Sequence, residues 1–170
     1  MWIIPYVAIA LGVIAIDQVS KLLILHFLYE DQLVLIKGVL NFTYVENRGM
    51  AFGLLSDHRW IFMVFSTIGI ALVGVYLWFY VKTKLGRAAL ALVIGGGIGN
   101  MIDRVAYGFV VDFIDFCAFD FWKWVFNIAD SAVCVGAGMF VLYLILDTVK
   151  QMKQAKAQEE KKESDDAANS

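Results

Sequence analysis

The residues of this chain that have the chemistry to catalyse or to bind are a few ionisable side chains placed within strongly apolar sequence. They are Asp17, Lys21, Asp103, Arg104, Asp112, Asp115 and Asp130. An ionisable side chain inside a membrane is costly unless it is paired or faces a wet cavity, so each is a candidate functional residue. Asp130 is the most informative, because no cationic residue lies within four positions of it. Its partner must come from another part of the chain.

The segment 109–116 (FVVDFIDF) supplies the obvious partner, either Asp112 or Asp115. Two carboxylates brought together at low dielectric cannot both ionise, so one of them keeps a proton. The ionised member can then deprotonate a water molecule while the protonated member polarises a substrate carbonyl, which is peptide hydrolysis of the aspartic type. The structural alternative is that Arg104 pairs with Asp130.

The remaining ionisable residues have structural interpretations. Asp17 and Lys21 are four positions apart, so they share one face of a helix and can pair there. Lys21 is also a weaker candidate for balancing the charge of a catalytic site. Asp103 and Arg104 are adjacent at a predicted helix end, where Arg104 can hold carboxylates or loop carbonyls.

Competing chemistries lack the residues they need. His26 and His58 are far apart and give no metal cluster, and no serine has a G-x-S-x-G context. Cys117 has no base that the sequence identifies, and Cys134 is expected to pack within a helix. We therefore expect no metal and no cofactor.

The composition indicates a membrane protein. Of the 170 residues, 61% are hydrophobic and 18% are charged, with a mean hydropathy of +0.71, whereas soluble domains are roughly 45–50% apolar and about 25% charged. This excludes a soluble enzyme and a disordered protein, and two cysteines exclude a disulfide scaffold. The net charge of −2 gives no support for nucleic-acid binding.

Apolar runs predict an all-α membrane fold, a bundle of four transmembrane helices at about residues 2–25, 60–81, 88–105 and 126–147. The first run lacks the charge and cleavage site of a signal peptide, so we expect a retained helix. The third run is short and rich in glycine, so either its helix ends inside the membrane or its polar end faces the protein interior. Alternation around Lys37-Gly38 predicts a small β-rich outer segment at about 32–55.

Charge distribution predicts the orientation. Positive charge gathers in the connection between the second and third helices and just after the fourth helix, at Lys82, Lys84, Arg87, Lys150, Lys153 and Lys156. Both termini are therefore expected to be cytoplasmic, and the candidate carboxylates of the third and fourth helices lie at the outer end. Residues 1–149 are expected to form one membrane-embedded domain. The polar cytoplasmic tail at 150–170 is expected to be a frayed extension of the fourth helix that becomes disordered.

Five sequence blocks resemble, in order and spacing, those of lipoprotein signal peptidase, the bacterial signal peptidase II family of membrane aspartic proteases. The resemblance covers about residues 10–148, and Met50, where the family usually has alanine, affects only the packing of one loop. The blocks are Asp17 with Lys21; Asn47, Gly49, Ala51, Phe52 and Gly53; Gly99, Asn100, Asp103 and Arg104; Val110 to Phe113; and Phe126, Asn127, Ala129, Asp130 and Ser131.

The resemblance implies that Asp112 and Asp130 are the catalytic dyad. It implies that the residues that orient the dyad or contact the substrate are Asn47, Asn100, Asp103, Arg104 and Asn127, with Asp17 and Lys21 in support. It further implies a β-cradle on the outer leaflet of the bacterial inner membrane, a substrate that is a prolipoprotein carrying diacylglycerol on a cysteine, cleavage just before that cysteine, contact with membrane lipid, and inhibition by globomycin-type cyclic peptides.

Three points stay open from the residues alone. Asn47 either donates to a developing oxyanion or caps the loop around Gly49. A small transporter or channel subunit would also hold carboxylates in the membrane, but at several depths and in duplicated halves. A scaffold without chemistry would leave Asp130 without a role.

Overall fold

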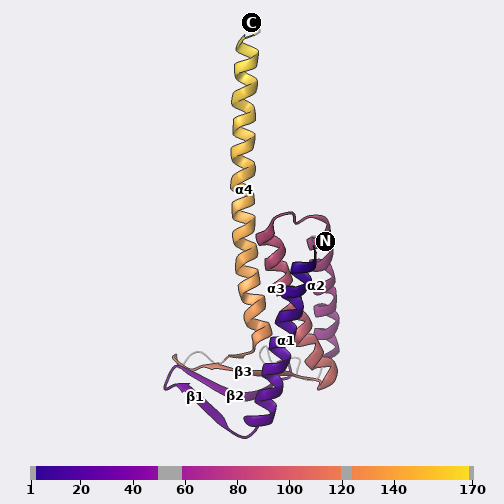
Figure 1. The fold of residues 1–170 in the computed structure, drawn as a ribbon, viewed down its shortest axis with the longest axis vertical. Coiled ribbons are helices and arrows are strands. Elements are labelled where there is room, and N and C mark those ends of the chain that lie inside the picture. The colour runs from indigo at the N-terminus through magenta and orange to yellow at the C-terminus, as the bar shows by residue number, and fades with distance from the viewer. Residues whose placement is uncertain (1–2, 50–58, 120–123, 169–170) are drawn as a thin grey trace.

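The protein is described by a computed structural model that covers residues 3–49, 59–119 and 124–168. The chain is mainly helical, with a small sheet laid across one end of the helices (Figure 1). The helices are α1 (Ile4–Phe27), α2 (Arg59–Phe79), α3 (Lys84–Ala106) and α4 (Ile128–Ala168). The strands are β1 (Gln32–Ile36), β2 (Leu40–Asn47), β3 (Val110–Phe116) and β4 (Val125–Phe126).

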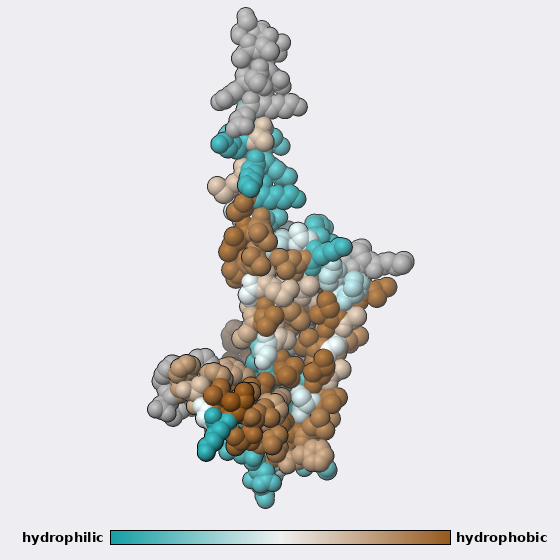
Figure 2. All heavy atoms as spheres, turned by 60° about the vertical axis from the view of Figure 1, so that its left-hand side comes forward, coloured by the Kyte–Doolittle hydropathy of each residue, from teal (hydrophilic) through white to brown (hydrophobic). Residues whose placement is uncertain are grey.

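The outer surface of the helices is apolar. Large hydrophobic side chains such as Leu11 and Phe65 are 60% and 71% exposed, and Figure 2 shows hydrophobic residues over much of the visible face of the bundle. Within the described residues, α1, α3 and the Ile128–Glu159 part of α4 are long and apolar enough to cross a membrane, and α2 carries a shorter apolar stretch, Met63–Phe79. Exposed apolar surface on this scale fits a multi-pass membrane protein.

Helix α3 is the centre of the bundle and packs against α1, α2 and α4. Thr83 caps its N-terminus by accepting a hydrogen bond from the Gly86 N–H at 3.1 Å, so the helix begins before the predicted residue 88. Its polar end faces the protein interior, since Asn100 and Asp103 are buried. Of the two interpretations of this short apolar run, an interior-facing polar end is therefore the one that the structure supports.

Glycines on α3 allow its neighbours to approach closely. A methyl group built on Gly96 would overlap the Ala129 carbonyl oxygen of α4, and one built on Gly95 would lie 2.9 Å from the Ala10 carbonyl oxygen of α1. On α4, a methyl group on Gly136 would lie 2.7 Å from the Ala89 carbonyl oxygen. This close contact between backbones is typical of membrane helices, and here it brings the first turn of α4 against the polar end of α3.

We expect Gly96→Ala to lower the free energy of unfolding by about 1–3 kcal/mol, because the added methyl group must push α4 away from α3. Gly138→Ala on α4 is the matched control, since a methyl group there meets nothing within 4 Å and alanine favours the helix by up to about 1 kcal/mol. Thermal unfolding in detergent measures both. Equal stability changes in the two variants would contradict the close packing at Gly96.

The four strands form one antiparallel sheet in the order β1-β2-β3-β4. The predicted hairpin is confirmed: β1 pairs with β2 through a turn at Gly38, whose φ is +73°. Residues 110–116 were not predicted to be a strand, yet they form β3, an interior strand of the sheet. Phe113 of β3 and Phe42 of β2 pack with Ile24 near the end of α1. The predicted β-rich segment extended to residue 55, and positions 50–55 lie outside the described residues.

Helix α4 differs from its predicted range. Residues 125–126 form β4, so the helix begins at Ile128 rather than near 126, and it continues to Ala168 instead of ending near 147. The tail, expected to be a frayed extension of this helix that becomes disordered, is helical as far as Ala168. The reason is composition: residues 148–168 are rich in Ala, Gln, Glu and Lys, which have high helix propensity. The extension projects beyond the other helices (Figure 1).

Candidate active site

Three elements bring the candidate carboxylates together. Strand β3 carries Asp112, which is buried, the first turn of α4 carries Asp130, which is half-buried, and the end of α3 contributes Asn100. Asn100 Nδ2 donates to Asp130 Oδ1 at 2.7 Å, and Asn127 Nδ2 donates to Asp112 Oδ1 at 2.7 Å. Asn127 Nδ2 also lies 3.1 Å from Asn100 Oδ1. The two carboxylates are therefore joined through a pair of side-chain amides.

The orientation of both amides is determined by groups that can only donate. Lys21 Nζ donates to Asn100 Oδ1 at 3.0 Å, so the Asn100 NH2 group must face Asp130. The backbone N–H of Asp130 donates to Asn127 Oδ1 at 2.8 Å, so the Asn127 NH2 group must face Asp112. The protein thus offers these carboxylates hydrogen-bond donors, and a proton on either carboxyl group is directed away from the amides.

Asn47 performs the loop role proposed for it and also contacts the site. Its Oδ1 accepts a hydrogen bond from the Gly49 N–H at 3.0 Å, where Gly49 has a φ of +89°, and its Nδ2 donates to Asp112 Oδ2 at 2.8 Å. A bulge in β2 between Phe42 and Val45 sets this register, because Val45 then lies opposite Asp112. Asn47 therefore holds the second oxygen of Asp112.

A buried cluster of charged side chains, Asp17, Lys21 and Asp103, lies next to the site. The predicted pair is confirmed, with Lys21 Nζ 2.8 Å from Asp17 Oδ2, and Asp103 Oδ2 lies 2.9 Å from the same ammonium group. Asp17 Oδ1 also accepts from the Ala129 N–H at 2.8 Å, and Asp103 Oδ2 accepts from the Val111 N–H at 3.0 Å. The cluster therefore fixes α1, α3, α4 and β3 to one another beside the two candidate catalytic carboxylates.

Arg104 and Asp115 were the alternative partners considered for Asp130. Arg104 donates to the Asn100 carbonyl oxygen at 3.3 Å. Its charge interacts with Asp130, Asp112 and Asp103, but within the described residues it forms no salt bridge with Asp130. Asp115 lies three residues further along β3, opposite Asn41, so Asp112 is the carboxylate that joins the amide network.

Gln18 also belongs to this network of buried polar contacts and was not among the predicted site residues. Its Nε2 lies 2.9 Å from Asp103 Oδ1, 3.1 Å from the Gly99 carbonyl oxygen and 3.2 Å from Asp17 Oδ2. The available signal was an uncharged polar residue next to Asp17 within an apolar run. Gln18 links α1 to the polar end of α3.

The surroundings of Asp112 favour the protonated form of its carboxyl group. Burial raises the pKa of Asp112 to about 7, and the negative charge of Asp130 acts in the same direction. Hydrogen bonds from Asn47 and Asn127 oppose this rise because they stabilise the ionised form. Within the described residues, no group of three His, Cys, Asp or Glu side chains is arranged to hold a metal ion. The site thus pairs a carboxyl group that retains a proton near pH 7 with a second carboxyl group, Asp130, which is joined to it through two amides.

Comparisons with known proteins identify the family of this chain. The sequence profile of Signal peptidase (SPase) II matches residues 9–146. The chain is 41% identical over 145 residues to a lipoprotein signal peptidase of Clostridioides difficile (strain 630), covering 82% of this chain and 94% of that protein. It is 42% identical over 140 residues to one from Halothermothrix orenii, covering 80% and 92%.

A solved structure of a bacterial membrane enzyme has a similar fold. It superposes with a TM-score of 0.79 at 33% sequence identity, and the match covers 87% of this chain and 92% of that one. A second bacterial membrane enzyme structure gives the same TM-score at 32% identity. The matched profile spans the helices, the sheet and both candidate carboxylates. The chain therefore belongs to the signal peptidase II family.

Proposed function

We propose that this protein is an aspartic endopeptidase that removes the signal peptide from diacylglyceryl-modified prolipoproteins and cuts on the N-terminal side of the lipidated cysteine. The observation that carries the proposal is the amide bridge that joins Asp112 to Asp130 through Asn127 and Asn100. The substrate class follows from the curated relatives, which are lipoprotein signal peptidases.

In the proposed mechanism Asp112 is the acid and Asp130 is the base. Asp112 is the better candidate to hold the proton, because burial raises its pKa to about 7. Both carboxyl groups accept hydrogen bonds at each oxygen, Asp130 from Asn100 Nδ2 and the Asn127 N–H, and Asp112 from Asn127 Nδ2 and Asn47 Nδ2. Burial therefore decides the assignment, because Asp112 is buried whereas Asp130 is half-buried. Asp130 takes a proton from water, the oxygen of that water attacks the scissile carbonyl carbon, and Asp112 donates its proton to the carbonyl oxygen.

The tetrahedral intermediate then collapses. Asp130 gives its proton to the departing amine nitrogen, the C–N bond breaks, and Asp112 recovers a proton from the hydroxyl group as the carboxyl product forms. No covalent bond to the enzyme is made, so water supplies the new oxygen of the signal peptide. The supporting residues in this scheme are Asn47, Asn100, Asp103, Arg104, Asn127, Asp17 and Lys21.

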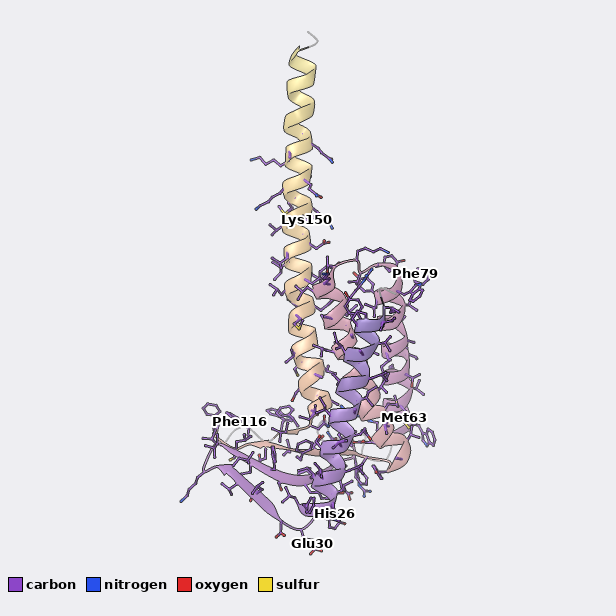
Figure 3. All side chains as sticks on the ribbon, in the orientation of Figure 1. His26, Glu30, Met63, Phe79, Phe116 and Lys150 are labelled. Atoms are coloured by element: carbon purple, nitrogen blue, oxygen red, sulfur yellow. The ribbon has the colours of Figure 1, made fainter. Side chains whose placement is uncertain are left out.

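We further propose that residues 1–149 form one domain with four membrane crossings in the bacterial inner membrane and that both termini are cytoplasmic. The start of α1, the α2–α3 connection and the extension of α4 lie at the end away from the sheet (Figure 1). Figure 3 shows Phe79 and Lys150 at that end and His26 and Glu30 at the other. The basic residues around the α2–α3 connection and after residue 149 favour the cytoplasm for the first end.

This orientation places the dyad at the outer leaflet, where the substrate must be cut. A lipidated cysteine stays at the headgroup level, because withdrawing its chains costs about 0.8 kcal/mol per methylene. The clustering also favours a peptidase over a transporter, since Asp17, Asp103, Asp112 and Asp130 gather at one end of the bundle rather than at several depths.

A cleavage assay tests the proposal. Purified protein in lipid nanodiscs is incubated with a diacylglyceryl-modified prolipoprotein, and loss of the signal peptide is followed as a gel shift. We expect cleavage of the modified substrate, much slower cleavage of the unmodified one, and inhibition by a globomycin-type cyclic peptide. A protein that leaves the modified substrate intact would overturn the proposed function and favour the transporter interpretation.

A plot of the cleavage rate against pH should be bell-shaped. On the acid side the rate falls because the ionised member of the dyad becomes protonated. On the alkaline side it falls as the pH rises through about 7, because Asp112, whose pKa is raised to about 7, loses the proton it must donate. The measurement is kcat/KM across acidic to alkaline pH on protein that stays folded, because this ratio reports the pKa values of the free enzyme. A flat profile contradicts the mechanism.

Asn47→Ala should move the alkaline limb of the pH–rate profile to higher pH. Asn47 donates to the ionised form of Asp112, so removing it raises the pKa of Asp112 further. A hydrogen bond to a charged group is worth about 1.5–3 kcal/mol, which corresponds to an upward shift of roughly one to two pH units. Asn41→Ala in the same strand is the control, since Asn41 contacts Cys117 instead. A lower rate in Asn47→Ala with no shift of the limb would leave Asn47 only its loop-capping role.

A further inference from the structure

An apolar groove runs between α2 and α4, with α3 as its floor. Its volume is about 560 Å³, and the lining residues used below are Leu72 and Tyr76 of α2, Leu90 and Val93 of α3, and Ala137 and Phe140 of α4. Tyr80, just after the end of α2, lines the groove at the end away from the sheet. No lining residue carries a charge. The groove lies outside the network of polar contacts described above.

The groove leads to the candidate catalytic carboxylates along two helices. On α3, Val93 precedes Asn100 by seven residues, and on α4, Ala137 follows Asp130 by seven. Seven residues are two helical turns, about 10 Å, so each pair shares a face of its helix. Asn100 and Asp130 are hydrogen-bonded to each other. The floor and one wall of the groove therefore continue directly to the dyad.

The groove opens laterally between α2 and α4, on the apolar outer surface of the bundle. Helix α2 packs mainly against α3, and Leu72 and Val75, which line the groove, are 64% and 53% exposed. An apolar segment lying in the membrane can enter between α2 and α4 without passing the polar sheet. The surface that receives it is apolar along its length, as burial within a membrane requires.

Building on the proposed function, we propose that this groove holds the apolar, membrane-embedded segment of the substrate's signal peptide, which precedes the scissile bond. Depth distinguishes this occupant from the acyl chains. Chains attached at the outer headgroup level reach about 15 Å, half of a hydrocarbon core of about 30 Å. The groove starts about 10 Å from the dyad and continues to Tyr80 at the far end of α2. A peptide that crosses the membrane occupies that whole length.

Site-specific photo-crosslinking tests the assignment. A benzophenone amino acid is placed at Ala137 in an Asp130→Asn background, which holds the substrate uncut, and the prolipoprotein is labelled in its signal peptide. The control position is Val135, which is 57% exposed and lies on the opposite face of α4. We expect crosslinks to the signal peptide from Ala137 to exceed those from Val135 several-fold. Equal yields, or crosslinks from Ala137 only to phospholipid or to the lipidated part of the substrate, overturn the assignment.

A kinetic variant provides a second test. Ala137→Trp fills the groove and should raise KM for the prolipoprotein about ten-fold, the scale of an unfavourable fit in an apolar pocket, with little change in kcat. Val135→Trp should leave both constants unchanged. An unchanged KM in folded Ala137→Trp overturns the groove assignment. Failure of the wild type to cleave the same substrate overturns the proposed function instead, so the two failures are distinguishable.

Discussion

Asp112→Asn and Asp130→Asn are each expected to lower kcat for prolipoprotein cleavage by at least about 10²–10⁴-fold, the usual contribution of general acid or general base catalysis. An asparagine at position 112 has no acidic proton to give to the scissile carbonyl oxygen, and one at position 130 cannot take a proton from water. Both substitutions keep the size of the side chain, but each replaces one accepting oxygen by an NH2 group that faces an N–H donor. Thermal unfolding of each variant therefore accompanies the kinetics, to show that the protein assayed is folded. The measurement is single-turnover cleavage with each purified variant.

Asp115→Asn is the matched control for this pair. Asp115 lies in the same strand and in an equally apolar stretch, but it is opposite Asn41 and outside the amide network. We expect it to keep nearly the rate of the wild type. If Asp112→Asn retained activity while Asp115→Asn lost it, the dyad would have to be reassigned to Asp115 and Asp130.

Lys21→Met is expected to lower the free energy of unfolding by about 3–5 kcal/mol, the cost of removing one partner from a buried ion pair. Asp17 and Lys21 are 0% and 2% exposed, and Asp103 is fully buried against the same ammonium group. Methionine fills similar space but leaves two carboxylates without a compensating charge. It also removes the donor that orients the Asn100 amide toward Asp130, so the remaining folded protein should cleave more slowly.

Lys82→Met is the control for the loss of a positive charge, since Lys82 is exposed in the α2–α3 connection. It should leave the free energy of unfolding within about 0.5 kcal/mol of the wild type, as surface substitutions usually do. Denaturant unfolding in mixed micelles compares the two variants. A Lys21→Met protein as stable as Lys82→Met would show that the buried cluster does not hold the helices together.

The helices and the candidate carboxylates could be predicted because their signals are local. A run of apolar residues must be helical to cross a bilayer, and Asp130 in such a run without a nearby cation requires a distant partner. The four-residue spacing likewise identified the Asp17–Lys21 pair that the structure contains. Because these helices face lipid, an ionisable residue within one of their apolar runs is easy to recognise in the sequence.

The features that were missed depend on long-range contacts. Residues 110–116 become a strand only because β2, more than sixty residues earlier, pairs with them. The role of Asn100 in joining Asp112 to Asp130 depends on a donor from α1, Lys21, and Asn127 reaches Asp112 in another element of the fold. Sequence spacing reveals neither contact. The alternatives for Asn47 could not be separated, because one amide group serves both the loop and Asp112.

The proposed peptidase mechanism is tested most directly by the mass of both products after the purified wild-type protein has acted on a diacylglyceryl-modified prolipoprotein in water enriched in ¹⁸O. We expect a lipoprotein that begins at the lipidated cysteine and a signal peptide whose new carboxyl group carries ¹⁸O, with neither product from Asp112→Asn or Asp130→Asn. Cleavage at another bond, ¹⁸O retained on an enzyme carboxylate after one turnover, or full activity in either variant would contradict it.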